Sequence, residues 1–335
     1  MNKVLITGVA GFLGSHIADA FIEKGYDVVG IDNLIGGYKE NVPAKAKFYE
    51  LDLDDLTSII PCFEGVSTVI HSACTAYEGL SVFSPSLVAR NTSQISTNVF
   101  SAAIAAKSSK IIFLSSMARY GTQEALPFVE SMSPKPQDPY GIAKYASELM
   151  LANLCQTHNL DYVTLVPHNI IGPRQKFDDP YRNVASIMIN RMLMGKQPII
   201  YGDGEQKRCF SFIQDVVNPI LNACETEKAL GRVINIGPDE EFVSINELAK
   251  IIASLLDFNL NPIYVAERPQ EVLQASCSAD LARELLNYKT STNLRTGLSE
   301  LVDWIKEKGP REFKYHLPLE IINQRTPKTW TEELI

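Results

Sequence analysis

The stretch Lys3-Val4-Leu5-Ile6-Thr7-Gly8-Val9-Ala10-Gly11-Phe12-Leu13-Gly14 decides the fold of this chain. Its first five residues predict a buried strand, and a helical pattern of apolar residues begins near Ser15, directly after the third glycine. Glycines in such a turn let a pyrophosphate approach the backbone at the N-terminus of the helix. On its own a glycine-rich turn is weak evidence, because such turns also simply connect strands to helices. Its place between the first predicted strand and the first predicted helix favours a dinucleotide site.

Short β-branched runs alternate with helix-like stretches through the first half of the chain. The predicted strands, each buried on both faces, are residues 3–7, 27–32, 47–51, 67–71, 110–115 and 162–167. The predicted helices between them are residues 15–24, 93–107 and 141–158. Alternation of this kind indicates a parallel, doubly wound α/β sheet.

The second half of the chain is expected to divide between this sheet and a smaller domain. A strand at residues 232–236, followed by a capping-box candidate formed by Ser244 and Glu247, is expected to return to the same sheet. The composition changes after Gly172, where a polar, charged and aromatic stretch (175–183) precedes a helix at 184–195. We therefore predict a dinucleotide-binding domain of residues 1–170, to which residues 208–250 return. A smaller interleaved α/β substrate domain then comprises residues 171–207 and 251–335, stacked over the carboxyl ends of the strands.

Composition sets broad limits on the function. With 335 residues, of which 45% are apolar and 21% charged, the chain is an ordinary globular protein long enough for two domains. The net charge of −8 argues against a nucleic acid or an acidic membrane surface as the partner. None of the six cysteines lies at Cys-x-x-Cys or metal-ligand spacing, so we expect reduced thiols, no metal site and a cytoplasmic location.

Two acidic residues at strand ends indicate how an adenosine moiety could be held. Asp32 closes the second strand, about 20 residues beyond the glycine turn, where a carboxylate accepts hydrogen bonds from ribose hydroxyls. A carboxylate there would repel a 2′-phosphate, so Asp32 favours NAD over NADP. Asp52 closes the third strand and is expected either to receive the adenine amino group or to cap the turn. Capping is also the alternative role of Asp32.

Tyr140 and Lys144 stand one helical turn apart and therefore share one face of their helix. A lysine ammonium held there favours the charged form of the phenol, whose ordinary pKa is about 10. Such a tyrosine can act as a base near neutral pH, which points to proton and hydride chemistry at a carbinol. Asp138 and Pro139 predict the start of this helix. Ser116, just after the fifth strand, faces the ligand crevice of such a sheet and can converge with the pair.

The order of these motifs resembles the extended short-chain dehydrogenase/reductase superfamily, especially its nucleotide-sugar epimerases of the UDP-glucose (UDP-galactose) 4-epimerase kind. The resemblance covers the chain to about Trp304. The motifs that carry it are Thr7-Gly8-x-x-Gly11-x-x-Gly14, Asp32-Asn33, Asp52-Leu53, Ser115-Ser116-x-x-x-Tyr120-Gly121 and Tyr140-x-x-x-Lys144. The resemblance implies a Rossmann-like fold, NAD as the cofactor and a nucleoside-diphosphate sugar, most readily a UDP-hexose, as the substrate.

The resemblance also implies the roles of individual residues. Ser116 would hydrogen-bond the reacting sugar hydroxyl, Tyr140 would be the general base and acid, and Lys144 would bind the nicotinamide ribose and lower the pKa of the tyrosine. The positions implied to contact the cofactor are Gly8, Gly11, Phe12, Leu13, Gly14, Asp32, Asn33, Asp52, Leu53, Ala73, Asn91, Tyr140, Lys144 and Pro167. Hydride would pass from the sugar to NAD⁺ and return to the other face of a keto-sugar that has turned over in the pocket.

A further set of positions matches the substrate half of the resemblance. Asn169 would lie near the substrate diphosphate, Arg208 and Arg268 would bind its phosphates, and Glu271 would meet the nucleotide ribose. For either arginine the alternative is a surface ion pair. The remaining positions expected to face the substrate are Tyr77, Ser116, Met117, Tyr140, His168 and Ala275.

The chain departs from the family pattern at several of these positions. His168 stands where relatives carry an aromatic residue, and it is expected either to contact the sugar or to cap a loop. Ala275 replaces a bulky residue and would leave space for a large substituent at C2, such as an N-acetyl group. Tyr77 and Glu78 are specific to this chain, and the tail of residues 311–335 has no counterpart that we recognise.

The residues after Ser116 bear on the choice of reaction. Related 4,6-dehydratases carry an Asp-Glu pair there, whereas this chain has Met117 and Ala118, which cannot do acid–base work. We therefore expect epimerisation, usually at C4. Oxidoreduction, decarboxylation or dehydration on the same fold are the enzymatic alternatives, and an NAD-binding regulator is the non-enzymatic one. By resemblance we also expect a homodimer that forms through the helices at residues 93–107 and 141–158.

Overall fold

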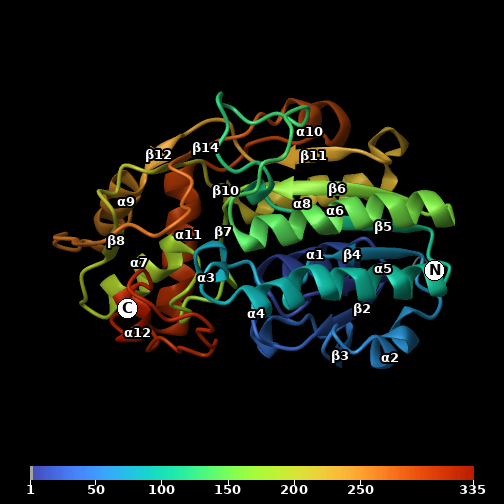
Figure 1. Cartoon of the computed structure of the whole chain (residues 1–335), viewed down its shortest axis with the longest axis horizontal. Helices are drawn as coiled ribbons and strands as arrows, with labels where there is room; N and C mark the ends of the chain where they lie inside the picture. Colours follow the sequence, from blue (N-terminus) through green and yellow to red (C-terminus); the bar gives the residue numbers. More distant parts are fainter. Residues whose placement is uncertain (1–2) are drawn as a thin grey trace.

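A parallel sheet forms the centre of the computed structural model, which describes residues 3–335. Its seven strands run in the order β11-β6-β5-β4-β1-β2-β3 (Figure 1). They are β1 (Lys3–Thr7), β2 (Asp27–Asp32), β3 (Lys47–Glu50), β4 (Thr68–His71), β5 (Lys110–Leu114), β6 (Asp161–Pro167) and β11 (Val233–Ile236). The strand order reverses at β1, which pairs with β2 on one side and β4 on the other. The predicted doubly wound α/β fold is confirmed.

Helices cover both faces of this sheet because its central strands are apolar on both sides. In β1, Val4 and Ile6 pack into the cluster that includes α1 (Phe12–Glu23) and α8 (Ile213–Glu225). Leu5 packs into the opposite cluster, with α5 (Ile95–Ala105) and α6 (Pro139–His158). Alternate residues of a strand point to opposite faces, so a continuous apolar run requires cover on both. Figure 1 shows α5 and α6 side by side along the near face of the sheet.

The helix starts follow from local chemistry. Helix α1 begins at Phe12, earlier than predicted, because Gly11 already has the extended conformation of an N-cap residue. Helix α6 begins as predicted, since the Asp138 carboxylate accepts the backbone N–H of Gly141 at 2.9 Å and Pro139 occupies the first turn. Helix α5 continues from a π-helical turn at Arg90–Gln94 that the sequence pattern does not reveal.

A smaller lobe lies at one end of the sheet and combines three helices with short strands (Figure 1). The helices are α7 (Val184–Leu193), α9 (Ile245–Leu256) and α11 (Leu294–Lys308), while α10 (Asp280–Leu286) packs against α8. The short strands are β7 (Ile170–Ile171), β8 (Ile199–Tyr201), β9 (Lys207–Arg208), β10 (Ser211–Phe212), β12 (Val243–Ser244), β13 (Ile263–Val265) and β14 (Gln274–Ala275). We propose the two-domain division with this lobe as the substrate domain.

The return to the large sheet is shorter than the sequence suggests. Strand β11 does join the sheet beside β6. The capping box between Ser244 and Glu247 is also present, with hydrogen bonds of 2.7 and 3.1 Å. However, α9 packs against α7 and α11 rather than on the large sheet. The apolar face of α9 is therefore buried in the smaller lobe, and the segment that returns to the sheet ends before β12.

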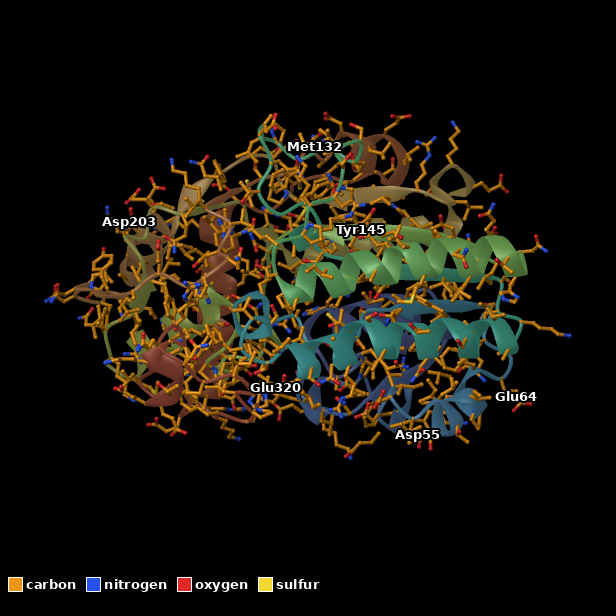
Figure 2. All side chains as sticks on the ribbon, viewed as in Figure 1. Asp55, Glu64, Met132, Tyr145, Asp203 and Glu320 are labelled. Atoms are coloured by element: carbon orange, nitrogen blue, oxygen red, sulfur yellow. The ribbon has the colours of Figure 1, made fainter. Side chains whose placement is uncertain are left out.

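Residues 311–335, here called the C-terminal strap, tie the smaller lobe to the sheet domain. The strap leaves α11, carries the short α12 (Lys328–Thr331) and passes over α3 (Glu78–Ser81) and α4 (Pro85–Ala89). The Glu320 carboxylate accepts the backbone N–H groups of Ser86 and Leu87, both at 2.8 Å, at the start of α4 (Figure 2). In the described part of the chain no helix is long and apolar enough to cross a membrane.

Candidate active site

A cavity of about 430 Å³ opens at the carboxyl ends of the central strands, between the sheet and the smaller lobe. Parallel strands that diverge to opposite sides of β1 leave a crevice at this point. The predicted site residues that line it are Gly8, Gly11, Phe12, Leu13, Gly14, Asp32, Asn33, Asp52, Leu53, Ala73, Tyr77, Asn91, Ser116, Tyr140, Lys144, Pro167, Asn169, Arg208, Arg268 and Glu271. The fold therefore gathers at one place residues that are spread over most of the chain.

The glycine turn forms a cradle that only glycine can build. Gly8 has a φ of +74°, and a Cβ atom on Gly14 would lie 2.1 Å from the carbonyl oxygen of Gly8. Helix α1 therefore starts against the turn, with its first N–H groups at the cavity. Free N–H groups at a helix N-terminus attract anions, so the cradle fits the pyrophosphate of a dinucleotide.

Asp32 and Asp52 lie at the adenosine end predicted for the cavity. The Asp32 carboxylate accepts the backbone N–H of Ala10 at 3.0 Å and that of Leu34 at 2.7 Å. Asp32 thus caps the adjoining turns and also faces the cavity. The two roles that the sequence left open, capping and binding of the ribose, are therefore compatible. Burial raises the pKa of Asp32, although these backbone hydrogen bonds oppose the shift. Asn33 donates to the Asp52 carboxylate at 3.3 Å, which connects the ends of β2 and β3.

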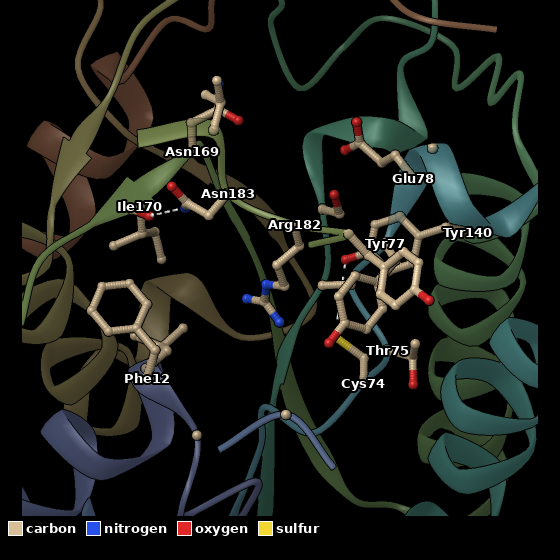
Figure 3. Close-up of a pocket in the computed structure, with 18 of the residues that line it drawn as sticks. Phe12, Cys74, Thr75, Tyr77, Glu78, Tyr140, Asn169, Ile170, Arg182 and Asn183 are labelled. Carbon is tan, nitrogen blue, oxygen red and sulfur yellow. Dashed lines mark hydrogen bonds between the residues drawn. The ribbon is translucent and has the colours of Figure 1, made fainter. Parts of the chain in front are cut away.

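Ser116, Tyr140 and Lys144 meet beside the cradle. The Lys144 ammonium donates to the carbonyl oxygen of Leu114, at the end of β5, with an Nζ–O distance of 2.7 Å. The Ser116 hydroxyl oxygen accepts the backbone N–H of Ala118 at 3.2 Å. The Tyr140 hydroxyl lies 4.0 Å from the Sγ atom of Cys74, a neighbour that sequence reasoning missed (Figure 3).

Several neighbouring groups act on the pKa of the Tyr140 hydroxyl. Burial raises its pKa well above the ordinary value, and Cys74 and Glu78 act in the same direction. The Ser116 hydroxyl and the Arg182 guanidinium lower it. Lys144 is fully buried, and its ammonium is engaged with the Leu114 carbonyl and lies 4.9 Å from the centre of the Phe113 ring. The lowering of the Tyr140 pKa by Lys144 therefore stays a prediction.

A buried ion pair behind the site fixes the end of β5 to α6. The Arg119 guanidinium is 2.9 Å from the Glu148 carboxylate, and both side chains are almost fully buried. The Ser115 hydroxyl donates to the same carboxylate. Breaking one member of a buried ion pair leaves an uncompensated charge, so this network is costly to disrupt. Because the network joins the end of β5 to α6, it fixes the position of Ser116 relative to Tyr140. No motif in the sequence predicted Glu148.

Two arginines enter the cavity from the smaller lobe. Arg208 is held by backbone carbonyls, at 2.8 Å from Lys207 and 3.1 Å from Leu273. Arg268 forms an ion pair with Glu271 at 3.0 Å and stacks over the Tyr201 ring, 4.6 Å from its centre. Arg268 therefore makes the ion pair that the sequence left as an alternative, but in the cavity wall rather than on the outer surface.

Polar side chains from both lobes complete the wall near these arginines. Asn169 lines the cavity with a positive φ of 32° and donates to the carbonyl of Cys209 at 3.2 Å. The Glu78 side chain is exposed to the cavity, but the surrounding protein and the nearby Asp138 raise its pKa to about 7, although the two arginines oppose the shift. Tyr77 donates to the buried Asp179 carboxylate. Burial, joined by the charge of that carboxylate, holds the pKa of Tyr77 well above its usual range.

Three predicted substrate residues, Met117, His168 and Ala275, do not line the cavity. Met117 and Ala275 pack together in a separate apolar cluster behind it. The space expected from a small residue at Ala275 is therefore not part of the site. His168 is 1% exposed, and neither ring nitrogen has a hydrogen-bond partner among residues 3–335. Burial and the charge of Arg208 lower its pKa to about 3, so the imidazole is neutral near pH 7 and lies outside the cavity wall.

Other residues that sequence reasoning missed also line the cavity, namely Cys74, Arg182, Tyr201 and Ile335. Cys74 lies in the loop after β4, and Arg182 lies in the polar and aromatic stretch before α7. Ile335 belongs to the C-terminal strap. The side chains of Arg182, Tyr201 and Ile335 reach the cavity only because the smaller lobe folds over the sheet.

The doubly wound sheet and the glycine cradle at its point of reversal define a Rossmann-type dinucleotide-binding protein. The chain belongs to the NAD dependent epimerase/dehydratase family, whose model matches residues 4–237. The family resemblance and the cofactor NAD predicted from the sequence are thereby confirmed.

Relatives and solved structures match nearly the whole chain. A UDP-glucose 4-epimerase of Mycolicibacterium smegmatis is 30% identical over 92% of this chain and 99% of its own length. The structure of a Thermotoga maritima UDP-glucose 4-epimerase with UDP-glucose is 32% identical, with a TM-score of 0.86 over 91% of this chain and 99% of that one. A Bacillus cereus UDP-glucuronic acid 4-epimerase, in complex with UDP-glucuronic acid and NAD, is 28% identical with a TM-score of 0.84 and covers 92% of this chain and 100% of that one.

Proposed function

We propose that this protein is an NAD-dependent epimerase of a nucleoside-diphosphate sugar, which inverts C4 of a hexose, with UDP-hexoses as the first candidates. One observation carries the proposal: Ser116, Tyr140 and Lys144 meet in one cavity with the glycine cradle. Met117 and Ala118, which follow Ser116, offer no acid for eliminating water. The relatives named above are 4-epimerases of UDP-sugars, which supports the same reaction.

The cradle and the two aspartates would hold the cofactor. The N–H groups at the start of α1 would bind its pyrophosphate, and Asp32 would accept the hydroxyls of the adenosine ribose. When bound, NAD supplies the acceptor and then the donor of the hydride. Lys144, fixed by the Leu114 carbonyl, would hydrogen-bond the second ribose.

Tyr140 would take the proton of the sugar hydroxyl and later return it. The Ser116 hydroxyl orients that sugar hydroxyl by hydrogen bonding. Because burial raises the pKa of Tyr140, nearby positive charge is needed before the phenol can act as a base near neutral pH. Arg182 already acts in this direction. Oxidation at C4 gives a keto-sugar, which turns over in the cavity and is reduced on its other face.

The arginines of the smaller lobe would hold the substrate by its diphosphate. Arg208 and Arg268 present planar guanidinium groups suited to phosphate oxygens. Glu271 pairs with Arg268 and would accept hydroxyls of the nucleotide ribose. Binding far from the reacting carbon leaves the hexose free to turn between the two hydride transfers.

The proposal is tested by incubating the purified protein with UDP-, GDP- and dTDP-hexoses and following the sugar epimers by NMR. We expect interconversion of one C4 epimer pair without net formation of NADH. Stoichiometric NADH would instead indicate an oxidoreductase. Failure to interconvert any epimer pair, with NAD shown to be bound, would refute the proposal.

We further propose that the protein is a cytoplasmic homodimer that assembles through α5 and α6. All six cysteines are free thiols, as a reducing compartment requires. On α6, Ile142 and Leu149 are 53% and 55% exposed, two turns apart on one face. Packing of α5 and α6 of one copy against α5 and α6 of the other would bury these side chains.

A further inference from the structure

A third arginine, Arg182, projects into the cavity between the cradle and Tyr140 (Figure 3). Its guanidinium lies 5.6 Å from the centre of the Tyr77 ring. The titratable groups that act on it most strongly are Tyr77, Cys74, Asp179 and Tyr140. The guanidinium therefore lies within electrostatic range of the proposed catalytic hydroxyl.

Arg182 differs from the other two arginines because it has no anionic partner. Among residues 3–335, no carboxylate oxygen lies within 4.0 Å of its guanidinium nitrogens. The carboxylate that acts on it most strongly is that of Asp179, which already accepts hydrogen bonds from the Tyr77 hydroxyl and the backbone N–H of Tyr181. Arg268, by contrast, pairs with Glu271, and Arg208 is satisfied by backbone carbonyls.

The Arg182 guanidinium cannot become neutral by losing its proton, because arginine stays charged in proteins. Arg182 is only half-buried, but it lines the cavity and makes no ion pair, so an anionic ligand in the cavity can pair with it. The cavity walls therefore offer one more anion-binding group than two diphosphates require. Those diphosphates have their own candidates, the start of α1 for the cofactor and the pair Arg208 and Arg268 for the substrate.

The position of Arg182 indicates which anion it serves. The carbon that is oxidised must lie against Tyr140, and Arg182 is among the charges acting on that hydroxyl. An anion there belongs to the sugar ring itself, next to the reacting carbon. In a hexose, C6 is joined to C5, the neighbour of C4, so a carboxylate at C6 comes close to the reacting hydroxyl.

We propose that Arg182 binds a carboxylate on the hexose, so that the substrate is a nucleotide-linked uronic acid rather than a neutral sugar. The inference rests on the proposed function and names its substrate class. A planar guanidinium binds a carboxylate through two parallel hydrogen bonds, which also fixes the orientation of the sugar. Neutral hexoses would leave the guanidinium unpaired and would bind more weakly.

The test compares UDP-glucuronate with UDP-glucose in the wild type and in Arg182→Met. We expect wild-type kcat/KM to favour UDP-glucuronate by at least tenfold and this preference to be lost in Arg182→Met, as expected when a charged contact to the substrate is removed. Arg174→Met is the matched control, because Arg174 lies in the same segment but pairs with Asp19 at 2.6 Å, outside the cavity. Its ratio should equal that of the wild type.

The outcomes separate this inference from the proposed function. Turnover of UDP-glucose with rejection of UDP-glucuronate, or an unchanged ratio in Arg182→Met, would overturn the inference and leave the epimerase proposal standing. Loss of bound NAD in Arg182→Met, with both sugars affected equally, would also overturn it by assigning the guanidinium to the cofactor. If no sugar is turned over, the proposed function fails, and calorimetric binding of the two nucleotides still decides whether Arg182 recognises a carboxylate.

Discussion

The Nζ atom of Lys144 lies 2.7 Å from the carbonyl oxygen of Leu114, so the lysine is fixed to the end of β5 rather than to Tyr140 one turn earlier on α6. The carbonyl orients the ammonium at the carboxyl edge of the sheet, where the ribose of a dinucleotide would lie. Tyr140 is left in a buried position where its pKa is raised. The two residues of the motif thus have separate environments, and each can be tested separately.

Replacing Tyr140 by phenylalanine should reduce turnover by about 1,000-fold or more, because proton transfer by a positioned group is lost. The variant should still bind NAD and nucleotide sugars, since the ring remains in place. Tyr145→Phe is the control, because Tyr145, labelled in Figure 2, lies on the same helix but does not line the cavity. Equal turnover in Tyr140→Phe and the wild type would remove Tyr140 from the mechanism.

Glu78 should make substrate binding dependent on pH. Its side chain is exposed to the cavity, but the surrounding protein and the neighbouring Asp138 raise its pKa to about 7, so the carboxyl is neutral below this pH and becomes negative above it. The negative form competes with a diphosphate for Arg208 and Arg268. We expect KM to rise about threefold or more from pH 6 to pH 8 and to stay flat in Glu78→Gln. A wild-type KM profile identical to that of the variant would contradict this role.

His168→Phe should stabilise the protein. The wild type buries two ring nitrogens without partners, and removing them should add about 1 kcal/mol to the free energy of unfolding. Since the ordinary pKa of 6.5 falls to about 3 on folding, only the unfolded chain takes up a proton between these values. The wild type therefore loses stability as the pH falls through this window. The gain in Tm should be larger near pH 5 than near pH 8, and the exposed His158→Phe should show neither effect.

The C-terminal strap should act on substrate binding through Thr329. Its hydroxyl is hydrogen-bonded to the Tyr201 hydroxyl at 2.5 Å, and Tyr201 lies under Arg268. Thr329→Val removes this hydrogen bond with little change in shape and should raise KM about threefold to tenfold while kcat stays within about twofold. Thr329→Ser should restore binding. A parallel fall in kcat, or the same effect in the exposed Thr331→Val, would indicate general destabilisation instead.

The proposed dimer should depend on the exposed face of α6. Ile142→Asp combined with Leu149→Asp places charges where apolar side chains would meet, and sedimentation should show monomers in place of dimers. Ile322→Asp, which changes a residue of the strap that is 68% exposed, is the control. A dimer that persists in the α6 variant would place the interface elsewhere.

The sequence by itself determined the sheet and the cofactor end of the cavity. The alternation of strands and helices, the glycine turn and Asp32 are local patterns, because each depends on neighbouring residues and on backbone geometry that the residue types restrict directly. The helix start at Asp138 and the capping box at Ser244 are local in the same sense, and the structure contains both.

Only the tertiary structure decided which side chains of the smaller lobe reach the cavity. Met117, His168 and Ala275 were placed by their position in family motifs, yet packing turns them into buried clusters away from the site. Arg182 belongs to no motif. Its lack of an ion pair is a property of the folded structure, because it depends on which segments pack around the guanidinium. The burial of these side chains, their ion pairs and the pKa of Tyr140 depend on contacts between segments that are distant in the sequence. The spacing of residues along the chain does not contain this information.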